Sequence, residues 1–301
     1  MIGDRNRLPE LAAELRALAP DVVIDLILSS GRQARDLMNV FRGVAARVVA
    51  LSSCDVYRAC GVLHGSEPGP LEPLPLAEHS ALRTISQTYS PDRVRMLQRV
   101  FGWLDDEYDK IPVEREILGD AELPGTVLRL PMVYGPGDRL HRWFPIVKRM
   151  DDRRPAIVFE DRHARWHSPR GYVENVAAAI VLAATSARAA GRVYNVAGAE
   201  NLSELEWARR IAAVTAWRGE FVVLPADRTP AHLRPGGNLD QHWVVDTTRI
   251  RDELGYAEPV AEHEAIRRAV EWERANPPAI DSGAFDYAAE DEAVLGYSRG
   301  R

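Results

Sequence analysis

The run VVIDLIL at residues 22–28 is almost wholly apolar and lies between the turn-forming residues Pro20 and Ser29. A short apolar run bounded in this way is typical of a strand that is buried on both faces of a parallel sheet. Two more runs of this kind follow, RVVAL at residues 47–51 and TVLRL at residues 126–130. Together the three runs predict the centre of a single parallel sheet.

Segments with apolar residues at helical spacing alternate with these strands. They lie at residues 8–18, 34–41, within 108–118, and at 173–184, 202–214 and 262–272, and a further short strand is predicted at 192–196. Strands that alternate with amphipathic helices indicate an α/β fold with a doubly wound parallel sheet. Ligands of such sheets bind beyond the carboxyl ends of the strands, which here are the residues near Leu28, Ser53 and Pro131.

Composition limits the possible functions. The chain has 301 residues, of which 46% are hydrophobic, enough for a large core, and its formal net charge of -6 with no long basic run argues against a nucleic-acid partner. The two cysteines, Cys54 and Cys60, have no partners at metal-ligand spacing, so we expect a cytoplasmic protein without a metal. No apolar stretch is long enough to span a bilayer, so we expect no membrane association.

Six motifs occur in a characteristic order along the chain. They are SSCDVY at 52–57, YDKIPVE at 108–114, LRLPMVYGPG at 128–137, GYVENVA at 171–177, VYNV at 193–196 and RIRDELGY at 249–256. In this order they resemble the extended short-chain dehydrogenase/reductase family, the group of NAD-dependent sugar epimerases and dehydratases. The resemblance implies a Rossmann-type sheet domain over 1–135, with 166–196 packing back on it. It also implies a smaller substrate lobe from 136–165 and 197–276, and we expect 277–301 to form a surface tail.

The resemblance is incomplete at the N-terminal end. The family's first βαβ unit carries a glycine-rich turn for the pyrophosphate, whereas Gly61 and Gly65 have the wrong spacing and follow no strand. The chain starts where the family's third strand would end, so we expect on the order of 50 residues of the family's pattern to be missing. Either the gene start lies further upstream, or the chain is a degraded or specialised relative. As given, we expect the chain to bind dinucleotide poorly and to expose apolar strand edges that favour aggregation.

The resemblance implies a catalytic set of Ser or Thr, Tyr and Lys. Ser53 matches the hydroxyl that bonds the reacting oxygen, and Lys110 matches the cation that holds the nicotinamide ribose. A phenol with a pKa of about 10 is a poor base at neutral pH, so an ammonium near the Tyr is required. The alternatives are a turn-forming Ser53 and a surface pair between Lys110 and Glu114.

The tyrosine departs from the family's spacing. The family has Tyr four residues before Lys, where this chain has Asp106, and Tyr108 stands only two residues before Lys110. Side chains two residues apart on a helix point in different directions. Pro112, however, disfavours a helical conformation in the residue before it, and in an extended chain the side chains of Tyr108 and Lys110 would face the same way. We predict Tyr108 as proton carrier, against the alternative of a packing or surface Tyr, with Tyr89 and Asp106 as lesser candidates.

The cofactor implied by the resemblance is NAD or NADP. Asp4 would bond the adenine edge, and Pro131 and Val133 would offer backbone groups to the nicotinamide amide. Ile27 and Leu28 stand where the family has small residues, so their larger side chains are expected to crowd the pyrophosphate. Met132 stands where sugar epimerases often carry Asn, at the substrate.

A cationic and aromatic cluster follows in the second half, formed by His163, Arg165, Trp166, His167 and Arg170. Arginine suits bidentate binding of phosphate or carboxylate. We therefore predict that Arg165, His167 and Arg170 bind the substrate; a solvated loop is the alternative.

The function implied is an epimerase, dehydratase or reductase that acts by hydride transfer on a sugar-like or nucleotide-sugar small molecule. A non-catalytic ligand-binding or regulatory relative is the alternative, favoured by the altered Tyr spacing. A nucleic-acid-binding offshoot of the fold is a third reading, which the net acidity opposes. A homodimer is an expectation from the family alone.

Overall fold

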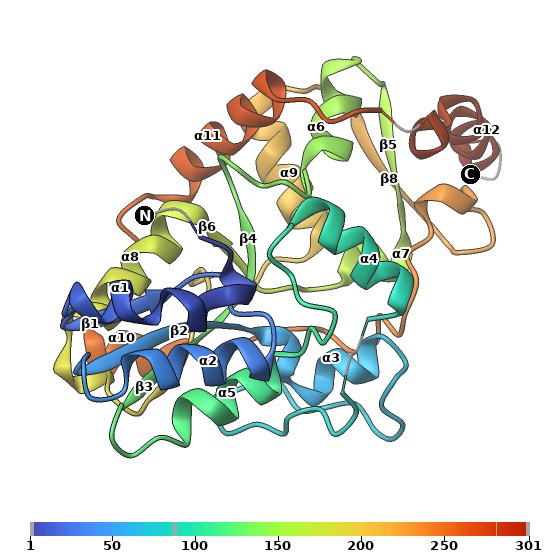
Figure 1. Ribbon diagram of the computed structural model, residues 1–301. Helices are drawn as coiled ribbons and strands as arrows, with labels where there is room; N and C mark the ends of the chain where they lie inside the picture. Colours follow the sequence, from blue (N-terminus) through green and yellow to red (C-terminus); the bar gives the residue numbers. More distant parts are fainter. Residues whose placement is uncertain (1–2, 87–88, 281, 299–301) are drawn as a thin grey trace.

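The computed structural model describes residues 3–86, 89–280 and 282–298. Its main sheet has four parallel strands in the order β1-β2-β3-β7 (Figure 1). The strands are β1 (Val22–Asp25), β2 (Arg47–Ser53), β3 (Gly125–Leu130) and β7 (Val193–Asn195). The predicted parallel α/β sheet is confirmed; the three apolar runs form β1, β2 and β3, but within the described residues β1 is an edge strand rather than a central one.

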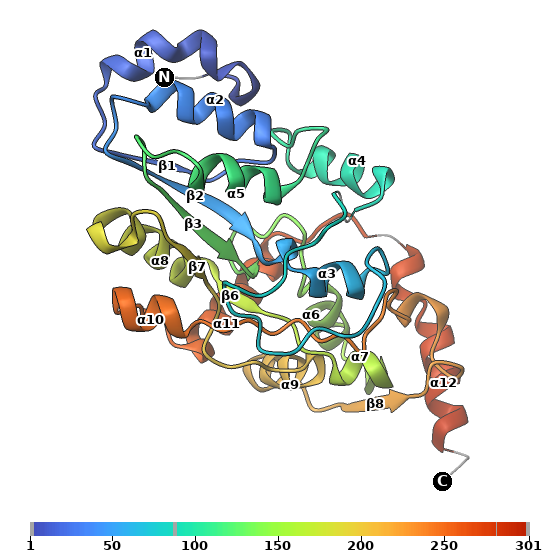
Figure 2. The same cartoon turned by 90° about the horizontal axis from the view of Figure 1, so that it is seen from below.

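Helices cover both faces of this sheet, as Figure 2 shows. One face carries α2 (Gly31–Phe41) and α5 (Lys110–Leu118), with η1 (Arg5–Leu11) and α1 (Ala12–Ala17) packed against α2. The other face carries α8 (Val173–Thr185) and α10 (Thr248–Leu254). The apolar side chains of β2 and β3 are therefore buried on both sides, as their unbroken hydrophobicity predicts, whereas Ile24 of β1 is exposed.

Two predicted boundaries differ from those observed. β1 ends at Asp25, because the Asp25 carboxylate accepts a hydrogen bond from the Ile27 amide at 3.0 Å and turns the chain. α5 begins at Lys110 rather than at Pro112, because Asp109 caps it by accepting from the Ile111 amide at 3.0 Å. Proline is tolerated at Pro112 since the first turn of a helix has no backbone partner for its nitrogen.

A second lobe packs beside the sheet domain. Its two-stranded parallel sheet pairs β5 (Ala156–Glu160) with β8 (Glu220–Leu224), neither of which the sequence pattern predicted. The helices α6 (Phe144–Asp151), α7 (Asp161–Arg165), α9 (Glu204–Thr215) and α11 (Glu262–Ala275) pack around an aromatic core. β4 (Met132–Tyr134) pairs with β6 (Arg170–Tyr172) between the two parts.

The remaining elements are short. They are η2 (Cys54–Val56), α3 (Arg58–Leu63), α4 (Pro91–Val100), η3 (Ala187–Ala189), η4 (Ala231–Leu233) and η5 (Ser282–Phe285). Residues of η2 and α4, together with His64 directly after α3, line the predicted ligand site where the strands end.

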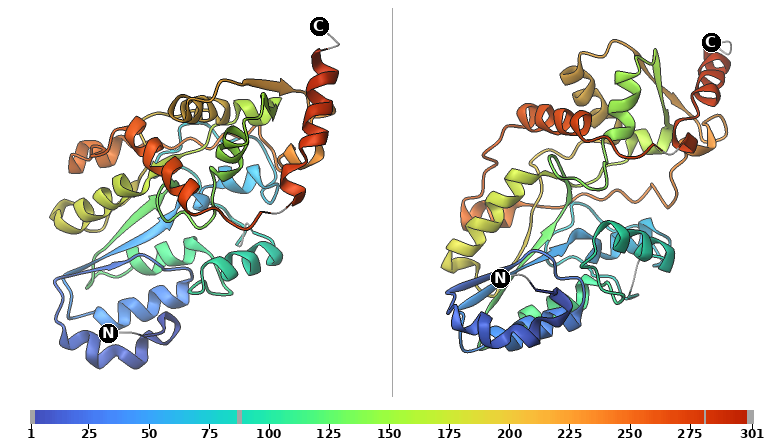
Figure 3. Two further views of the ribbon diagram at one scale, coloured as in Figure 1. Left: turned by 90° about the horizontal axis from the view of Figure 1, so that it is seen from above. Right: turned by 45° about the horizontal axis from the view of Figure 1, so that its top comes forward.

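The segment expected as a surface tail over residues 277–301 contains the helix α12 (Tyr287–Ser298), which lies at the far end of the molecule from the N-terminus (Figure 3) and is anchored by one buried residue, Glu290. The carboxylate of Glu290 is buried against the guanidinium of Arg149, 2.6 Å away. Val294 packs against β5 and β8. The acidic residues suggested solvation, but the buried Arg149 requires a carboxylate partner from this helix.

An exposed edge of the main sheet gives a first testable prediction. Within the described residues β1 pairs with β2 alone, and Ile24 is 42% and Leu26 56% exposed. Ile24→Lys is expected to reduce self-association, because a charge on an edge strand opposes pairing with another chain. Light scattering at increasing protein concentration measures the effect. Val181→Lys, which charges an exposed apolar position on helix α8, is the control, and an equal reduction by both variants would contradict the role of the edge.

Candidate active site

A cavity of about 380 Å³ lies at the carboxyl ends of β2 and β3, where the sequence predicted ligand binding. Its walls come from β2 and η2, from α4, from the loop before α5, and from the turn between β3 and β4. Its polar lining includes Ser53, Asp55, Tyr89, Tyr108 and Lys110, while most of the remainder is apolar or aromatic. The three predicted catalytic residues are thus brought together.

Lys110 is the first residue of α5, and its side chain is buried. Its ammonium donates to the carbonyl oxygen of Leu28 and, at 3.1 Å, to that of Leu51. Burial lowers the pKa of Lys110 to about 8, against the opposing effect of the Asp55 carboxylate. The alternative of a surface pair with Glu114 is wrong, because Glu114 is itself buried and pairs with Arg129 at 2.7 Å.

Tyr108 lies outside the helix. The intervening Asp109 is extended, with φ −157° and ψ 129°, so Tyr108 and Lys110 both line the cavity. The Tyr108 hydroxyl donates to the Asp55 carboxylate at 3.1 Å, while the Lys110 ammonium lies 5.9 Å from the centre of the Tyr108 ring. Burial, and then the Asp55 charge, raise the pKa of Tyr108 well above its usual value.

Asp55 is the residue that the sequence analysis missed. It is 2% exposed, and its Oδ2 accepts from the hydroxyls of Tyr108 and, at 3.4 Å, Tyr89. Its Oδ1 is buried without a hydrogen-bond partner in the described part of the chain. Burial raises the pKa of this carboxyl, against the charges of Arg83 and Lys110. The available signal was its position two residues after Ser53, at the end of a buried strand.

Ser53 forms the turn that the sequence offered as one alternative, and it also lies at the cavity where its predicted role as the hydroxyl near the reacting oxygen stays a prediction. Its hydroxyl oxygen accepts from the Asp55 amide at 3.2 Å and so caps the turn η2. The same side chain lines the cavity beside Lys110 and Tyr108. The turn therefore holds Ser53 and Asp55 at the cavity wall together.

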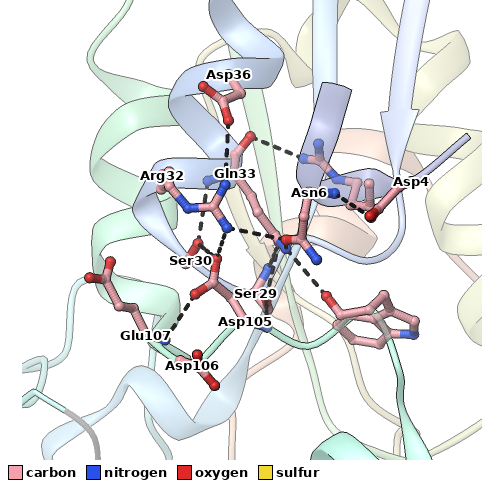
Figure 4. Close-up of polar contacts among 12 residues, drawn as sticks. Asp4, Asn6, Ser29, Ser30, Arg32, Gln33, Asp36, Asp105, Asp106 and Glu107 are labelled. Carbon is pink, nitrogen blue, oxygen red and sulfur yellow. Dashed lines mark hydrogen bonds and ion pairs between the residues drawn. The ribbon is translucent and has the colours of Figure 1, made fainter. Parts of the chain in front are cut away.

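The loop before α5 is tied to the start of α2, as Figure 4 shows. Asp105 accepts from the Ser30 hydroxyl at 3.0 Å and from Arg32, and its amide donates to the Ser29 hydroxyl oxygen at 2.8 Å. The Asp109 amide donates to the Ser29 carbonyl at 3.0 Å. Tyr108 is therefore held between two attachments to one turn.

Two predicted residues lie away from the cavity. The carboxylate of Asp4 is exposed and caps η1 by accepting from the Asn6 amide at 2.9 Å (Figure 4). Asp106, one of the lesser candidates, is exposed and accepts from the Gln98 amide nitrogen at 2.7 Å. Neither side chain lines the cavity that holds Lys110.

Of the residues predicted around the nicotinamide and pyrophosphate, some line the cavity and others lie away from it. Pro131 and Met132 line the cavity, whereas the Val133 carbonyl accepts from Arg142 at 2.9 Å. Ile27 is half-buried at the turn after β1. The expected crowding by Leu28 is wrong, because its side chain is buried in the core between the sheet and α2 and only its carbonyl faces Lys110.

The predicted cationic cluster does not form one surface. Trp166 lines the cavity described above, but Arg165 is exposed and pairs with Asp161, and His167 is half-buried and contacts the Asn201 carbonyl at 2.9 Å. Arg170 is buried and paired with Glu204 at 2.6 Å. The side chains diverge because α7 ends at Arg165 and the chain then runs into β6.

Arg170 instead lines a second cavity, of about 340 Å³, in the other lobe. Trp143 and Trp207 form part of its wall, and Arg142 lines both cavities. The indole nitrogens of both tryptophans and Nε of Arg170 are buried donors without a partner in the described part of the chain. Unpaired buried donors favour a ligand rich in acceptor atoms.

The described residues fit one end of a nicotinamide dinucleotide. Ser53, Lys110 and Pro131 surround a cavity with an unpaired carboxylate oxygen, which suits the nicotinamide and its ribose. For the pyrophosphate, the described part of the chain shows no glycine-rich turn at a helix start, and Asp4 is engaged in its own cap.

Two further searches concern metals and membranes. Among residues 3–86, 89–280 and 282–298, no three or more His, Cys, Asp or Glu side chains gather in a way that could hold a metal ion. In the same residues no helix is both long and apolar enough for a membrane span.

Comparisons with known proteins agree with the sequence resemblance. Residues 113–197 match the model of the NAD dependent epimerase/dehydratase family. A dTDP-glucose 4,6-dehydratase of Streptomyces niveus is 31% identical over 154 residues, which span 50% of this chain and 42% of the dehydratase. The chain thus matches less than half the length of this relative.

Solved structures share the fold. An epimerase from Methanothermobacter thermautotrophicus superposes with a TM-score of 0.62 at 18% identity, covering 92% of this chain and 78% of the epimerase. A UDP-glucuronic acid 4-epimerase from Bacillus cereus, in complex with UDP-glucuronic acid and NAD, gives 0.61 at 15% identity, covering 89% and 78%. The resemblance to the extended short-chain dehydrogenases/reductases is confirmed, in fold over most of the chain and in sequence over part of it.

Proposed function

We propose that this chain, which has the fold of the extended short-chain dehydrogenases/reductases and the epimerase/dehydratase pattern over residues 113–197, acts on a nucleotide-sugar or other sugar-like substrate with NAD or NADP. One observation carries the proposal. Ser53 at the end of β2 and the pair Tyr108 and Lys110 at the start of α5 line one cavity at the carboxyl ends of the central strands.

Each residue has a role that its geometry supports. The Ser53 hydroxyl bonds the reacting oxygen, the Lys110 ammonium donates to the nicotinamide ribose, and the Tyr108 hydroxyl carries the proton. The bound dinucleotide supplies the centre that accepts or returns a hydride. Because Lys110 already donates to two carbonyls, it has one proton left for the ribose.

The second cavity is proposed to hold the nucleotide end of the substrate. The unpaired indole donors of Trp143 and Trp207 suit base or phosphate oxygens, and the rings offer apolar surface for stacking. Arg142 lines both cavities, so one extended ligand would contact it from either side.

Binding of NADH at different pH values tests this function. The folded-state pKa of Lys110, lowered to about 8, means that the ammonium is present below pH 8 and lost above it. NADH should therefore bind about tenfold more weakly at pH 9 than at pH 7, since a hydrogen bond to a charged group contributes about 1.5 kcal/mol. Quenching of Trp fluorescence by NADH, up to millimolar concentrations, measures the affinity.

The controls use two lysine variants. Lys110→Ala should bind NADH weakly at both pH values, and Lys148→Ala, on α6 in the other lobe, should behave as the native chain does. NADH binding that is absent, or that is unaffected by Lys110→Ala, would refute the proposed function.

A non-catalytic ligand-binding relative is the second candidate. The observation that favours it is the Tyr108 hydroxyl, which contacts Asp55 rather than Lys110. Such a protein would bind UDP-glucuronic acid with the same affinity whether NADH is present or not. An enzyme of the proposed kind would bind the two ligands interdependently, because they would meet in one cavity.

A further inference from the structure

Asp55 occupies a particular place in the first cavity. It is the sole carboxylate among the described residues that line this cavity. Both tyrosine hydroxyls in the lining, those of Tyr108 and Tyr89, donate to its Oδ2, and its Oδ1 is buried without a partner in the described residues. A buried carboxylate with an unused oxygen has a high cost unless that oxygen serves a ligand or a proton.

The surroundings of Asp55 contain charges of both signs. Arg83 donates through Nε to the Asp55 carbonyl at 2.6 Å and through Nη2 to Asp109 at 3.1 Å. Lys110 and Arg83 favour the ionised carboxylate, whereas Asp109 and the burial of the site oppose it. The thiols of Cys54 and Cys60, the imidazole of His64 and the guanidinium of Arg93 also lie nearby.

We propose that Asp55 is the proton acceptor behind Tyr108, so that a proton leaving a substrate hydroxyl passes to the Tyr108 oxygen as the Tyr108 proton passes to Oδ2 of Asp55. This inference rests on the proposed function. In the transfer the substrate O–H bond breaks and a Tyr108 O–H bond forms, while the original Tyr108 O–H bond breaks and an Asp55 O–H bond forms. Tyr108 is neutral before and after, and the negative charge moves from Asp55 to the substrate oxygen; the reverse transfer restores it.

The geometry favours Asp55 over Lys110 for this task. The Tyr108 hydroxyl is within hydrogen-bond distance of Asp55, whereas the Lys110 ammonium is committed to the carbonyls of Leu28 and Leu51. A Tyr108 whose pKa is raised by burial and by Asp55 is neutral at physiological pH. A neutral phenol can take up a substrate proton only if it gives its own proton to an acceptor. A carboxylate hydrogen-bonded to the phenol is such an acceptor, so no free phenolate has to form.

Tyr89 is a second, weaker donor to the same oxygen. Its hydroxyl lies 3.4 Å from Oδ2, compared with 3.1 Å for Tyr108. It therefore holds the carboxylate in place more than it stabilises the charge. Because the two distances differ, removing the Tyr89 hydroxyl should shift the Asp55 titration midpoint less than removing the Tyr108 hydroxyl does.

The test is a pH titration of the whole chain labelled with ¹³C in its Asp carboxyl groups, followed by NMR. The resonance absent from Asp55→Asn identifies Asp55. Tyr108→Phe should shift the Asp55 midpoint upward by about 0.5 to 1 pH unit, because it removes the donor that stabilises the carboxylate, and Tyr89→Phe should shift it upward by less. Tyr287→Phe is the matched control: its hydroxyl contacts Asp152 at 2.6 Å in the other lobe, so it should move the Asp152 midpoint and leave that of Asp55 unchanged.

An Asp55 midpoint that is the same in Tyr108→Phe and in the native chain would overturn the inference. The titration needs neither NADH nor substrate, so this failure is distinguishable from a failure of the proposed function, which would show as an absence of NADH quenching. A kinetic arm uses UDP-glucuronic acid with NAD as the probe. If the native chain turns over this probe and Asp55→Asn does so at the same rate, the inference is also overturned. A loss of turnover in Asp55→Asn, with partial recovery of the rate in Asp55→Glu, would support it.

Discussion

Glu114→Gln is expected to lower the free energy of unfolding by about 3–5 kcal/mol, because it leaves the buried charge of Arg129 without its partner. The two side chains pair at 2.7 Å and are 5% and 4% exposed. Glu114 also accepts from the Ser52 hydroxyl at 2.6 Å, so three segments lose an attachment at once. Urea denaturation followed by circular dichroism measures the change.

The control for this variant lies on the same helix. Glu116→Gln removes a carboxylate that pairs with Arg35 at the surface, so it should cost at most about 1 kcal/mol. Equal losses of unfolding free energy in the two variants would show that the buried Glu114–Arg129 pair stabilises the fold no more than the surface pair of Glu116 and Arg35 does. Replacing both Glu114 and Arg129 by apolar residues should recover part of the loss, since no buried charge then remains unpaired.

Asp55→Asn is expected to have the opposite effect on stability. The pKa of Asp55 is raised in the folded chain, chiefly by burial, so its contribution to stability is complete at low pH and is lost as the pH rises through its folded-state midpoint. The Asn variant avoids this loss. At pH 8 it should therefore be more stable than the native chain.

The pH dependence distinguishes this explanation from a general improvement in packing. The advantage of Asp55→Asn should shrink as the pH falls and the native Asp55 becomes protonated, because both chains then carry an uncharged side chain at this position. Asp227→Asn, at an exposed loop position, should show no such trend. An Asp55→Asn variant that is less stable than the native chain at pH 8 would contradict the premise that this carboxylate is held at a cost for function.

The motifs that made the family recognisable are mostly structural in this chain. Arg129 donates to Glu114 and, at 2.9 Å, to the hydroxyl of Tyr57, which in turn donates to Asn195 at 2.6 Å. One buried network thus joins residues from four of the motifs and links β2, β3, α5 and β7. Because such a network requires particular residues at particular strand ends, the order of the motifs predicted the fold well.

The site was less predictable. Ser53 and Lys110 could be placed because strand ends and helix starts of a parallel sheet meet at one edge. Asp55 could not, since its burial depends on Tyr89 and Tyr108, which lie 34 and 53 residues away in the chain. Sequence spacing alone does not show which side chains are enclosed.

The other errors also come from long-range contacts. Neighbouring basic residues suggested one binding surface, but Arg170 turns inward to Glu204, 34 residues further along. The five-residue strands β5 and β8 are too short to carry a clear pattern, and each is stabilised by pairing with the other. The charge of Glu290 suggested solvent exposure until its partner 141 residues away was known.

The buried carboxylate of the last helix has a consequence for ligand binding. Glu290 contacts His232 at 3.0 Å as well as Arg149, and both of these partners line the second cavity. Shortening the chain before Tyr287, or fusing a bulky label that pulls this helix away, would leave Arg149 and His232 in the cavity wall without their carboxylate partner. The helix α12 therefore supports two residues of the cavity that we propose for the nucleotide end of the substrate, so nucleotide-sugar affinities measured on protein without this helix should differ from those of the intact chain.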